Sequence, residues 1–339
     1  MRKTGRLYYI DSIKGLFALC IASFHLFNSI GYNEYEWLRP FYLYGNMLTS
    51  FFFFSSGYFL EKTRIRICFV EFMKKRLIKI YKMYIPIIIG TIVVKIIFKE
   101  LIRPINILFS FLMLQGGYIN DDVGYFMNSG ILGIDWFLGP LFFCYFLYWI
   151  INDGTRRTEY KYIIEILIVI YGIIIMESNI SLPMINSIMS QGLVGFYCGV
   201  LYENYENYYS QRINKGSVLL VAMTAMVLIP LILKYTYRTM EDCLIMLCIV
   251  TYPILFMSCF KLDILKKFLE NNILRFVGNV SSEIYFSHVL ILNICSKIKF
   301  FQYLNFGYKC LLFYFCVLSA SYGLKFLSKS EMKFLIDIY

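Results

Sequence analysis

The stretch DSIKGLFALCIASFH runs from Asp11 to His25. It begins with an acid and a lysine, continues as an apolar run and ends with one of only two histidines in the chain. On a helix Lys14 and His25 lie close to three turns apart, so they share a face and are separated by about 16 Å along the axis. Ionisable groups inside a membrane are costly and commonly mark a path or a site, so His25 is predicted to be functional. A structural hydrogen bond to a neighbouring helix is the alternative.

The composition around this stretch is that of an integral membrane protein. Hydrophobic residues make up 59% of the chain and charged residues only 16%, against about 25% charged residues in soluble domains. The net charge of +11 comes from basic residues clustered between apolar runs. That pattern sets membrane orientation and does not indicate a nucleic-acid partner. The cysteines occur singly, without a C-x-x-C pair, so neither a disulfide framework nor a metal site is predicted.

The apolar segments predict an all-α fold, because a helical span needs roughly 20 predominantly apolar residues. One further run, at 105–115, is too short to cross and is interpreted as a re-entrant half-helix whose ends other helices must cover. We therefore predict a polytopic membrane helix bundle that forms a single domain over residues 1–339. The ten expected transmembrane helices are 7–30, 41–60, 84–103, 134–151, 161–177, 188–203, 217–235, 242–260, 280–298 and 307–327.

The distribution of lysine and arginine predicts the orientation of this bundle. When the N-terminus is placed inside and the loops alternate, most basic residues fall in the inside loops. Basic residues concentrate on the cytosolic side of membrane proteins. We therefore expect a multi-pass protein of the cytoplasmic (inner) membrane with both termini in the cytosol.

The segment KTRIRICFVEFMKKRLIKIYKMYIP, at 62–86, is basic and amphipathic. Arg76 and Lys79 lie one helical turn apart, so together they are able to grip a pyrophosphate group of an anionic donor that arrives from the cytosol. The structural alternative is a surface helix that rests on anionic lipid. The two interpretations are compatible.

Three further polar or aromatic positions stand out in the first half of the chain. In FFFFSSGYFL, at 51–60, Ser55 and Ser56 are small enough to let a ligand or another backbone approach, although packing alone also explains them. Trp136 opens the fourth expected span, where an aromatic residue is typical of the membrane interface.

The second histidine, His288, follows Tyr285 in the stretch VGNVSSEIYFSH at 277–288. It falls in the half of the ninth expected span that is nearer the cytosol. His288 could either meet His25 across the bundle or support a separate polar network, and the sequence leaves both open.

Taken together, these segments resemble the acyltransferase family 3 membrane proteins, which transfer acetyl or other short acyl groups onto extracytoplasmic glycans. Four segments that follow the first helix are similar to motifs of this family and occur in the same order as in the family. They are FFFFSSGYFL, KKRLIKIYKMY, WFL at 136–138 and VGNVSSEIYFSH. Many relatives carry arginine where this chain has Lys14 and Lys79, which keeps the charge but loses the planar guanidinium fork. The first-helix pattern of the family is matched here by Arg6, Asp11, Lys14, Gly15 and His25.

The resemblance implies an O-acyltransferase in which His25 is the catalytic base and acyl-CoA is a cytosolic co-substrate, with no permanently bound cofactor. We expect an acetyl group from acetyl-CoA to reach a hydroxyl of an extracytoplasmic or lipid-linked glycan, as in polysaccharide O-acetylation of a cell envelope. Asp11 is expected to pair with Lys14 and orient it. The residues expected to bind acyl-CoA are Lys14, Arg76, Lys79, Ser55 and Ser56, with the phosphates near the three basic side chains. Oxyanion stabilisation is expected near Ser55 and Ser56 or near Tyr285 and His288.

Other functions remain compatible with the residues alone. A multi-span transporter or flippase of a lipid-linked saccharide would also place polar residues inside a helix bundle. A scaffold for glycan assembly would need neither His25 nor Lys14. Within the acyltransferase reading, a covalent acyl-histidine relay is the alternative to direct transfer. A homodimer is compatible with the sequence.

Overall fold

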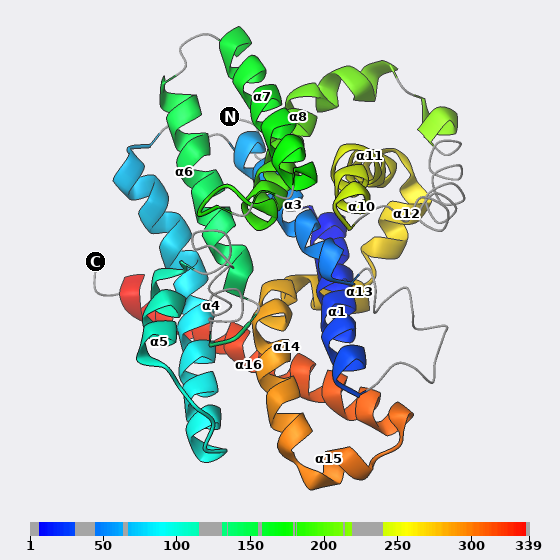
Figure 1. Cartoon of the computed structure of the whole chain (residues 1–339). Helices are drawn as coiled ribbons and strands as arrows, with labels where there is room; N and C mark the ends of the chain where they lie inside the picture. The colour runs from blue at the N-terminus through cyan, green and yellow to red at the C-terminus, as the bar shows by residue number, and fades with distance from the viewer. Residues whose placement is uncertain are drawn as a thin grey trace.

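The computed structural model describes residues 7–30, 45–63, 67–114, 131–133, 135–154, 158–178, 180, 182–212, 214–218 and 240–336. Within these ranges all regular elements are helices, apart from one isolated bridge between Leu182 and Ile185, which confirms the predicted all-α class. The elements (Figure 1) are α1 Tyr8–Ile30, η2 Gly45–Leu48, α3 Thr49–Lys62, α4 Phe69–Ile97, α5 Pro104–Leu112, η4 Asp135–Phe137, α6 Leu138–Gly154, α7 Thr158–Glu177, α8 Ser187–Arg212, α10 Met240–Met246, η5 Leu247–Thr251, α11 Tyr252–Lys261, α12 Asp263–Leu269, α13 Asn272–Asn279, α14 Ser281–Lys297, α15 Lys299–Tyr303 and α16 Phe306–Ile336.

Four helical stretches among the described residues are long and apolar enough to cross a membrane, by length and composition. This agrees with an all-α membrane protein, whereas the expected number of ten spans stays a prediction. Helices occur at the positions of the expected spans, except that 217–235 lies almost wholly outside the described residues. The four stretches are Tyr8–Ile30, Phe69–Ile97, Asp242–Lys261 and Phe306–Ser328.

The helix α4 differs from the expectation at this part of the chain. The span expected at 84–103 forms only the second half of a longer helix, because one helix runs without interruption from Phe69 to Ile97. Backbone hydrogen bonds propagate through both halves regardless of the change in side-chain polarity, and Pro86 lies inside the helix without ending it. Residues such as Arg76 and Lys79 are thereby fixed rigidly to a helix whose second half is apolar.

The short helix α5 is too short to cross a bilayer. Nine residues span about 14 Å at 1.5 Å per residue, less than half of a hydrocarbon core of about 30 Å. Its C-terminal end is covered, because the hydroxyl of Tyr81 on α4 donates to the carbonyl of Phe111 and the hydroxyl of Ser110 accepts from the Ile131 amide at 3.0 Å. These contacts supply the cover that a half-helix needs.

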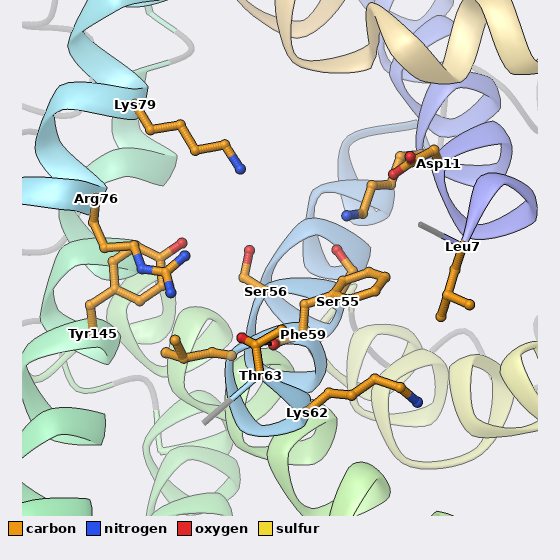
Figure 2. Close-up of a pocket in the computed structure, with 12 residues that line it drawn as sticks. Leu7, Asp11, Ser55, Ser56, Phe59, Lys62, Thr63, Arg76, Lys79 and Tyr145 are labelled. Atoms are coloured by element: carbon orange, nitrogen blue, oxygen red, sulfur yellow. Dashed lines mark hydrogen bonds between the residues drawn. The ribbon is translucent and has the colours of Figure 1, made fainter. Parts of the chain in front are cut away.

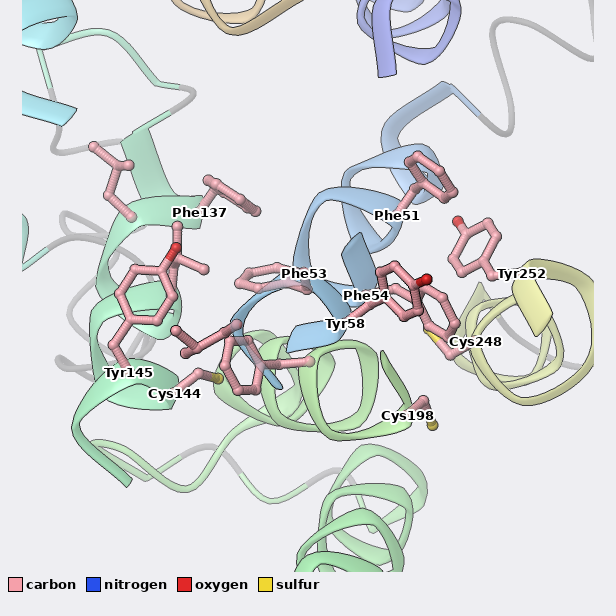
Figure 3. Packing of buried hydrophobic residues seen from close by; sticks show 14 of the residues in the cluster. Phe51, Phe53, Phe54, Tyr58, Phe137, Cys144, Tyr145, Cys198, Cys248 and Tyr252 are labelled. Carbon is pink, nitrogen blue, oxygen red and sulfur yellow. The ribbon is translucent and has the colours of Figure 1, made fainter. Parts of the chain in front are cut away.

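The centre of the bundle is the crossing of α3 and α8, where two glycines let the backbones approach. A β-carbon at Gly57 would lie 2.0 Å from the carbonyl oxygen of Phe196, and one at Gly199 would lie 2.0 Å from that of Phe54. Small residues permit such close crossings in membrane proteins. Aromatic side chains fill the space beside the crossing, among them Phe53, Phe54 and Tyr252 (Figure 3).

The first helix, α1, packs against the C-terminal part of the chain. It packs against α13 and α14, and α14 in turn contacts α4 and α16 (Figure 1). The two histidine-bearing helices, α1 and α14, are therefore neighbours.

Candidate active site

A cavity of about 470 Å³ lies between α1, α3, α4 and α6 (Figure 2). It brings together six predicted site residues from three separate segments of the sequence. These are Asp11, Lys14, Ser55, Ser56, Arg76 and Lys79; the remaining lining residues are Leu7, Phe59, Leu60, Lys62, Thr63 and Tyr145. The cavity thus brings the five residues expected to bind the donor together with Asp11.

The charges around the cavity favour an anionic ligand. Four basic side chains line it, from Lys14, Lys62, Arg76 and Lys79, and one acidic side chain, from Asp11. Arginine and lysine together offer a planar fork and point-charge ammonium groups, which suit phosphate oxygens. The hydroxyls of serine, threonine and tyrosine on the same walls add hydrogen-bond donors that a phosphate can use.

The two α4 cations reach the cavity from one face of their helix. Residues three positions apart on a helix are neighbours on its surface, and Figure 2 shows Arg76 and Lys79 extending toward α3 while Asp11 lies on the opposite side. The guanidinium carbon of Arg76 lies 5.5 Å from the ring centroid of Phe72 and 5.6 Å from that of Tyr145. Cation–π contacts of this kind hold a cation in place without neutralising its charge.

The same support is found at Lys14, whose Nζ lies 4.4 Å from the ring centroid of Phe59. Asp11 and Lys14 both line the cavity from α1, one turn apart. The predicted pairing of Asp11 with Lys14 stays a prediction.

Sequence analysis missed Lys62 and Tyr145. Lys62 lies seven residues, about two turns, after Ser55 on α3, so helical periodicity places both residues on one face. The sequence therefore contained a local signal for Lys62. The Nζ of Lys62 lies 3.1 Å from a carboxylate oxygen of Glu206 on α8, and it also donates to the hydroxyl of Tyr58. Tyr145 comes from α6 and lines the same cavity as Ser56 on α3, a proximity of distant segments for which the sequence contains no local signal.

A glycine pair sets the position of the α1 wall. A β-carbon on Gly15 would lie 2.6 Å from the backbone nitrogen of Gly278 on α13, and a β-carbon on Gly278 would lie 2.5 Å from the carbonyl of Asp11. Only two glycines permit this backbone contact. Gly15 follows Lys14 directly, so the contact anchors the turn of α1 that carries both charged residues of the cavity wall.

The predicted residues outside the cavity form a second cluster, built by α1 and α14. The ring centroids of His25 and His288 lie 5.1 Å apart, which places the two histidines in contact across the bundle. The Tyr285 ring lies 5.9 Å from that of His288 and 5.5 Å from that of Phe137, which in turn contacts Trp136. His25 is half-buried and His288 fully buried.

The two groups of residues are connected by α1. Lys14 lines the cavity, and His25 lies eleven residues further along the same helix, about 16 Å away at 1.5 Å per residue. His25, Tyr285, His288 and Trp136 do not line the cavity. The charged cavity therefore lies at the N-terminal end of α1, and the histidine pair lies toward the C-terminal end of the same helix.

In the part of the chain that the structure describes, no group of three or more His, Cys, Asp or Glu residues is close enough to hold a metal ion.

Comparison with known proteins identifies the kind of chain that carries this arrangement. A family model described as an acyltransferase domain matches residues 7–328, which is nearly the whole sequence. No curated protein and no solved structure matches the chain.

Proposed function

The chain belongs to the acyltransferase domain family, and from that membership we propose that it moves an acyl group from cytosolic acyl-CoA to a hydroxyl of an extracytoplasmic or lipid-linked glycan, with His25 as general base. The acyl group we expect is acetyl. The protein acts in the cytoplasmic membrane with both termini in the cytosol, without a permanently bound cofactor.

The observation that carries this proposal is the cavity with four basic side chains and one acid. Coenzyme A carries all its phosphates at one end and its thioester at the other, joined by a linear arm. A chamber lined by Arg76 and three lysines matches the phosphate end, because charge-assisted contacts to phosphate are the strongest hydrogen bonds available there. In this proposal Ser55 and Ser56 add donors, and Asp11 orients Lys14.

The spacing between Lys14 and His25 along α1 supports the proposed role of His25 as the base that acts on the donor's thioester. With the phosphates beside Lys14, the arm of the donor extends along the helix for about 16 Å and brings the thioester to His25. The glycan hydroxyl approaches from the opposite compartment. His25 is half-buried, and burial among apolar side chains keeps water away from the reacting thioester.

The chemistry balances with one base. His25 takes the proton of the glycan hydroxyl while the oxygen attacks the thioester carbonyl carbon. The tetrahedral intermediate then collapses, the carbon–sulfur bond breaks, and the thiolate takes the proton from the His25 imidazolium to leave as free coenzyme A. In this scheme Tyr285 and His288 support the reacting end, with Trp136 at its margin, whereas Ser55 and Ser56 belong to the donor chamber.

The experiment is transfer from radiolabelled acetyl-CoA in proteoliposomes, with the acceptor glycan analysed by mass spectrometry. The His25→Ala variant is expected to lose transfer at unchanged membrane abundance. Asn28→Ala, an exposed position one turn further along α1, is the matched control and should retain it. Undiminished transfer by His25→Ala would overturn the assignment of the base. Sugar movement across the bilayer without label in the glycan would favour the flippase instead.

The same assay separates the two chemical routes. Direct transfer leaves no label on the protein when the acceptor is omitted. We propose direct transfer; a covalent acyl-histidine relay would instead leave label on His25 under those conditions, and hydroxylamine would remove it because an acyl imidazole is an activated acyl group.

A further inference from the structure

The hydrogen bonding of His288 fixes which of its nitrogens carries the proton. Its Nδ1 lies 3.1 Å from the carbonyl oxygen of Ile284, one turn earlier on α14. A carbonyl oxygen only accepts hydrogen bonds, so Nδ1 must donate and must carry the hydrogen. In the neutral ring Nε2 is then an unprotonated acceptor.

That acceptor lacks a donor. The Nε2 atom of His288 is buried and finds no hydrogen-bond partner among the residues that the structure describes. The side chain is 0% exposed, so water does not reach it in this arrangement. A buried polar atom without a partner is costly and rare in native proteins, which indicates that a donor belongs there.

The His25 ring is in position to supply that donor. Its centroid lies 5.1 Å from that of His288, with an angle of 40° between the ring planes. At this separation the ring edges are close enough for an N–H to reach Nε2 after a small rotation about χ2, which is a soft torsion in histidine. The Phe24 ring packs against His25 on another side, 4.9 Å away in an edge-on contact, and offers no acceptor that competes.

We propose that His288 is a positioning residue whose Nε2 accepts the N–H of His25 and so fixes the tautomer of the base. One nitrogen of His25 then always carries the hydrogen that points to His288, and the other nitrogen is left unprotonated toward the glycan hydroxyl. This inference rests on the proposed role of His25 as general base. After His25 takes the substrate proton, its imidazolium still donates to His288, and the stronger charge-assisted bond favours the transition state.

The Tyr285 hydroxyl is the rival donor, because its ring also lies near His288, at 5.9 Å between centroids. A purely packing role for His288 is the second rival. In that case an aromatic ring without nitrogen, such as phenylalanine, would serve as well as imidazole.

The chain contains only two histidines, which makes nitrogen NMR a direct test. Full-length protein labelled with ¹⁵N-histidine in bilayers should give one ring with protonated Nδ1 and a hydrogen-bonded Nε2, from His288. A second ring, from His25, should occur as one tautomer. The variant His25→Ala assigns the signals. In His288→Phe the His25 ring should become a mixture of tautomers, and in Tyr285→Phe it should stay as in the wild type.

Kinetics provide the second readout. His288→Phe should lower kcat by roughly 10- to 100-fold, as the loss of a hydrogen bond to a charged base predicts, with little change in KM for acyl-CoA. His288→Gln keeps a side-chain acceptor and should recover part of that loss. A His288→Phe protein with wild-type kcat and an unchanged His25 tautomer would overturn the inference while leaving the proposed function intact. Full transfer activity of His25→Ala would instead overturn the assignment of His25 as the base, on which this inference rests, and the wild-type NMR spectra would still report whether the two rings are bonded.

Discussion

The backbones of Gly15 on α1 and Gly278 on α13 are in direct contact, so that a β-carbon on Gly15 would lie 2.6 Å from the Gly278 nitrogen. Gly15→Ala must therefore push the two helices apart, since backbone atoms cannot rotate away as a flexible side chain can. We expect a loss of about 1–3 kcal/mol in stability, typical of overpacking, and a raised KM for acyl-CoA because Lys14 moves with the helix. Thermal unfolding in detergent and initial rates measure the two effects.

A matched control for this variant is Gly323→Ala on α16, where an added β-carbon meets nothing within 4 Å. It should leave KM within error of the wild type and should not lower stability, because alanine favours a helix over glycine. Equal behaviour of Gly15→Ala and Gly323→Ala would show that the close contact does not constrain the cavity.

The role of the cavity cations is tested by changing the donor together with the protein. Arg76→Gln removes a guanidinium from the cavity wall, and a lost charged hydrogen bond of about 1.5–3 kcal/mol raises KM for acyl-CoA roughly 10- to 100-fold. The effect should vanish with an acyl-pantetheine donor, which carries no phosphate. Lys74→Gln, at an exposed α4 position outside the cavity lining, is the control. An Arg76→Gln penalty of the same size with both donors would contradict phosphate binding at this site.

Local sequence signals predicted much of this cavity, because its residues lie in motifs with helical spacing. Asp11 and Lys14 share a face of one helix, and Arg76 and Lys79 share a face of another. The opposition of these two faces depends on tertiary packing, which local periodicity does not encode.

The contacts that sequence reasoning missed are those between segments distant in the chain. Gly278 was noticed as part of a motif, but its contact with Gly15 becomes apparent only when α1 and α13 are placed together. In the same way the sequence left open whether His288 meets His25, and the structure brings their rings together. The basic segment at 62–86 and the span expected at 84–103 prove to be parts of one helix, α4, because the backbone hydrogen bonds continue through the change from basic to apolar side chains.

A buried ion pair between α3 and α7 predicts a large stability effect. The Nζ of Lys161 on α7 lies 2.7 Å from a carboxylate oxygen of Glu61 on α3 and 3.5 Å from one of Glu165, and all three side chains are almost fully buried. The Tyr148 hydroxyl donates to the other oxygen of Glu61 at 2.7 Å. Removing one partner of a buried pair costs about 3–5 kcal/mol, because charge is left uncompensated. Lys161→Met should therefore unfold at a much lower temperature in detergent.

The control for this prediction is Lys75→Met, because Lys75 pairs with Glu71 at 2.7 Å but both side chains are more than half exposed. Exposed pairs contribute roughly 0–1 kcal/mol, so its melting temperature should barely move. A Lys161→Met protein as stable as Lys75→Met would contradict a stabilising role for this buried pair.

The connection after α4 predicts a dependence of stability on pH. Hydrogen bonds from the ammonium groups of Lys297, at 2.9 Å, and Lys95, at 3.2 Å, lower the pKa of the Glu100 carboxyl and tie the end of α14 to the end of α4. A carboxyl whose pKa is lower in the folded state stabilises the fold above its unfolded pKa, and this contribution is lost as the pH falls through the folded pKa. When the pH is lowered from 7 to 3, the melting temperature of Glu100→Gln should therefore fall less than that of the wild type. The melting temperatures of the two proteins should converge at the acidic end of this range. Because Glu100 is about a third exposed, 1 M salt should shrink the difference at pH 7. If the melting temperatures of the two proteins instead changed in parallel with pH, the two lysines would not be holding Glu100 in its charged form.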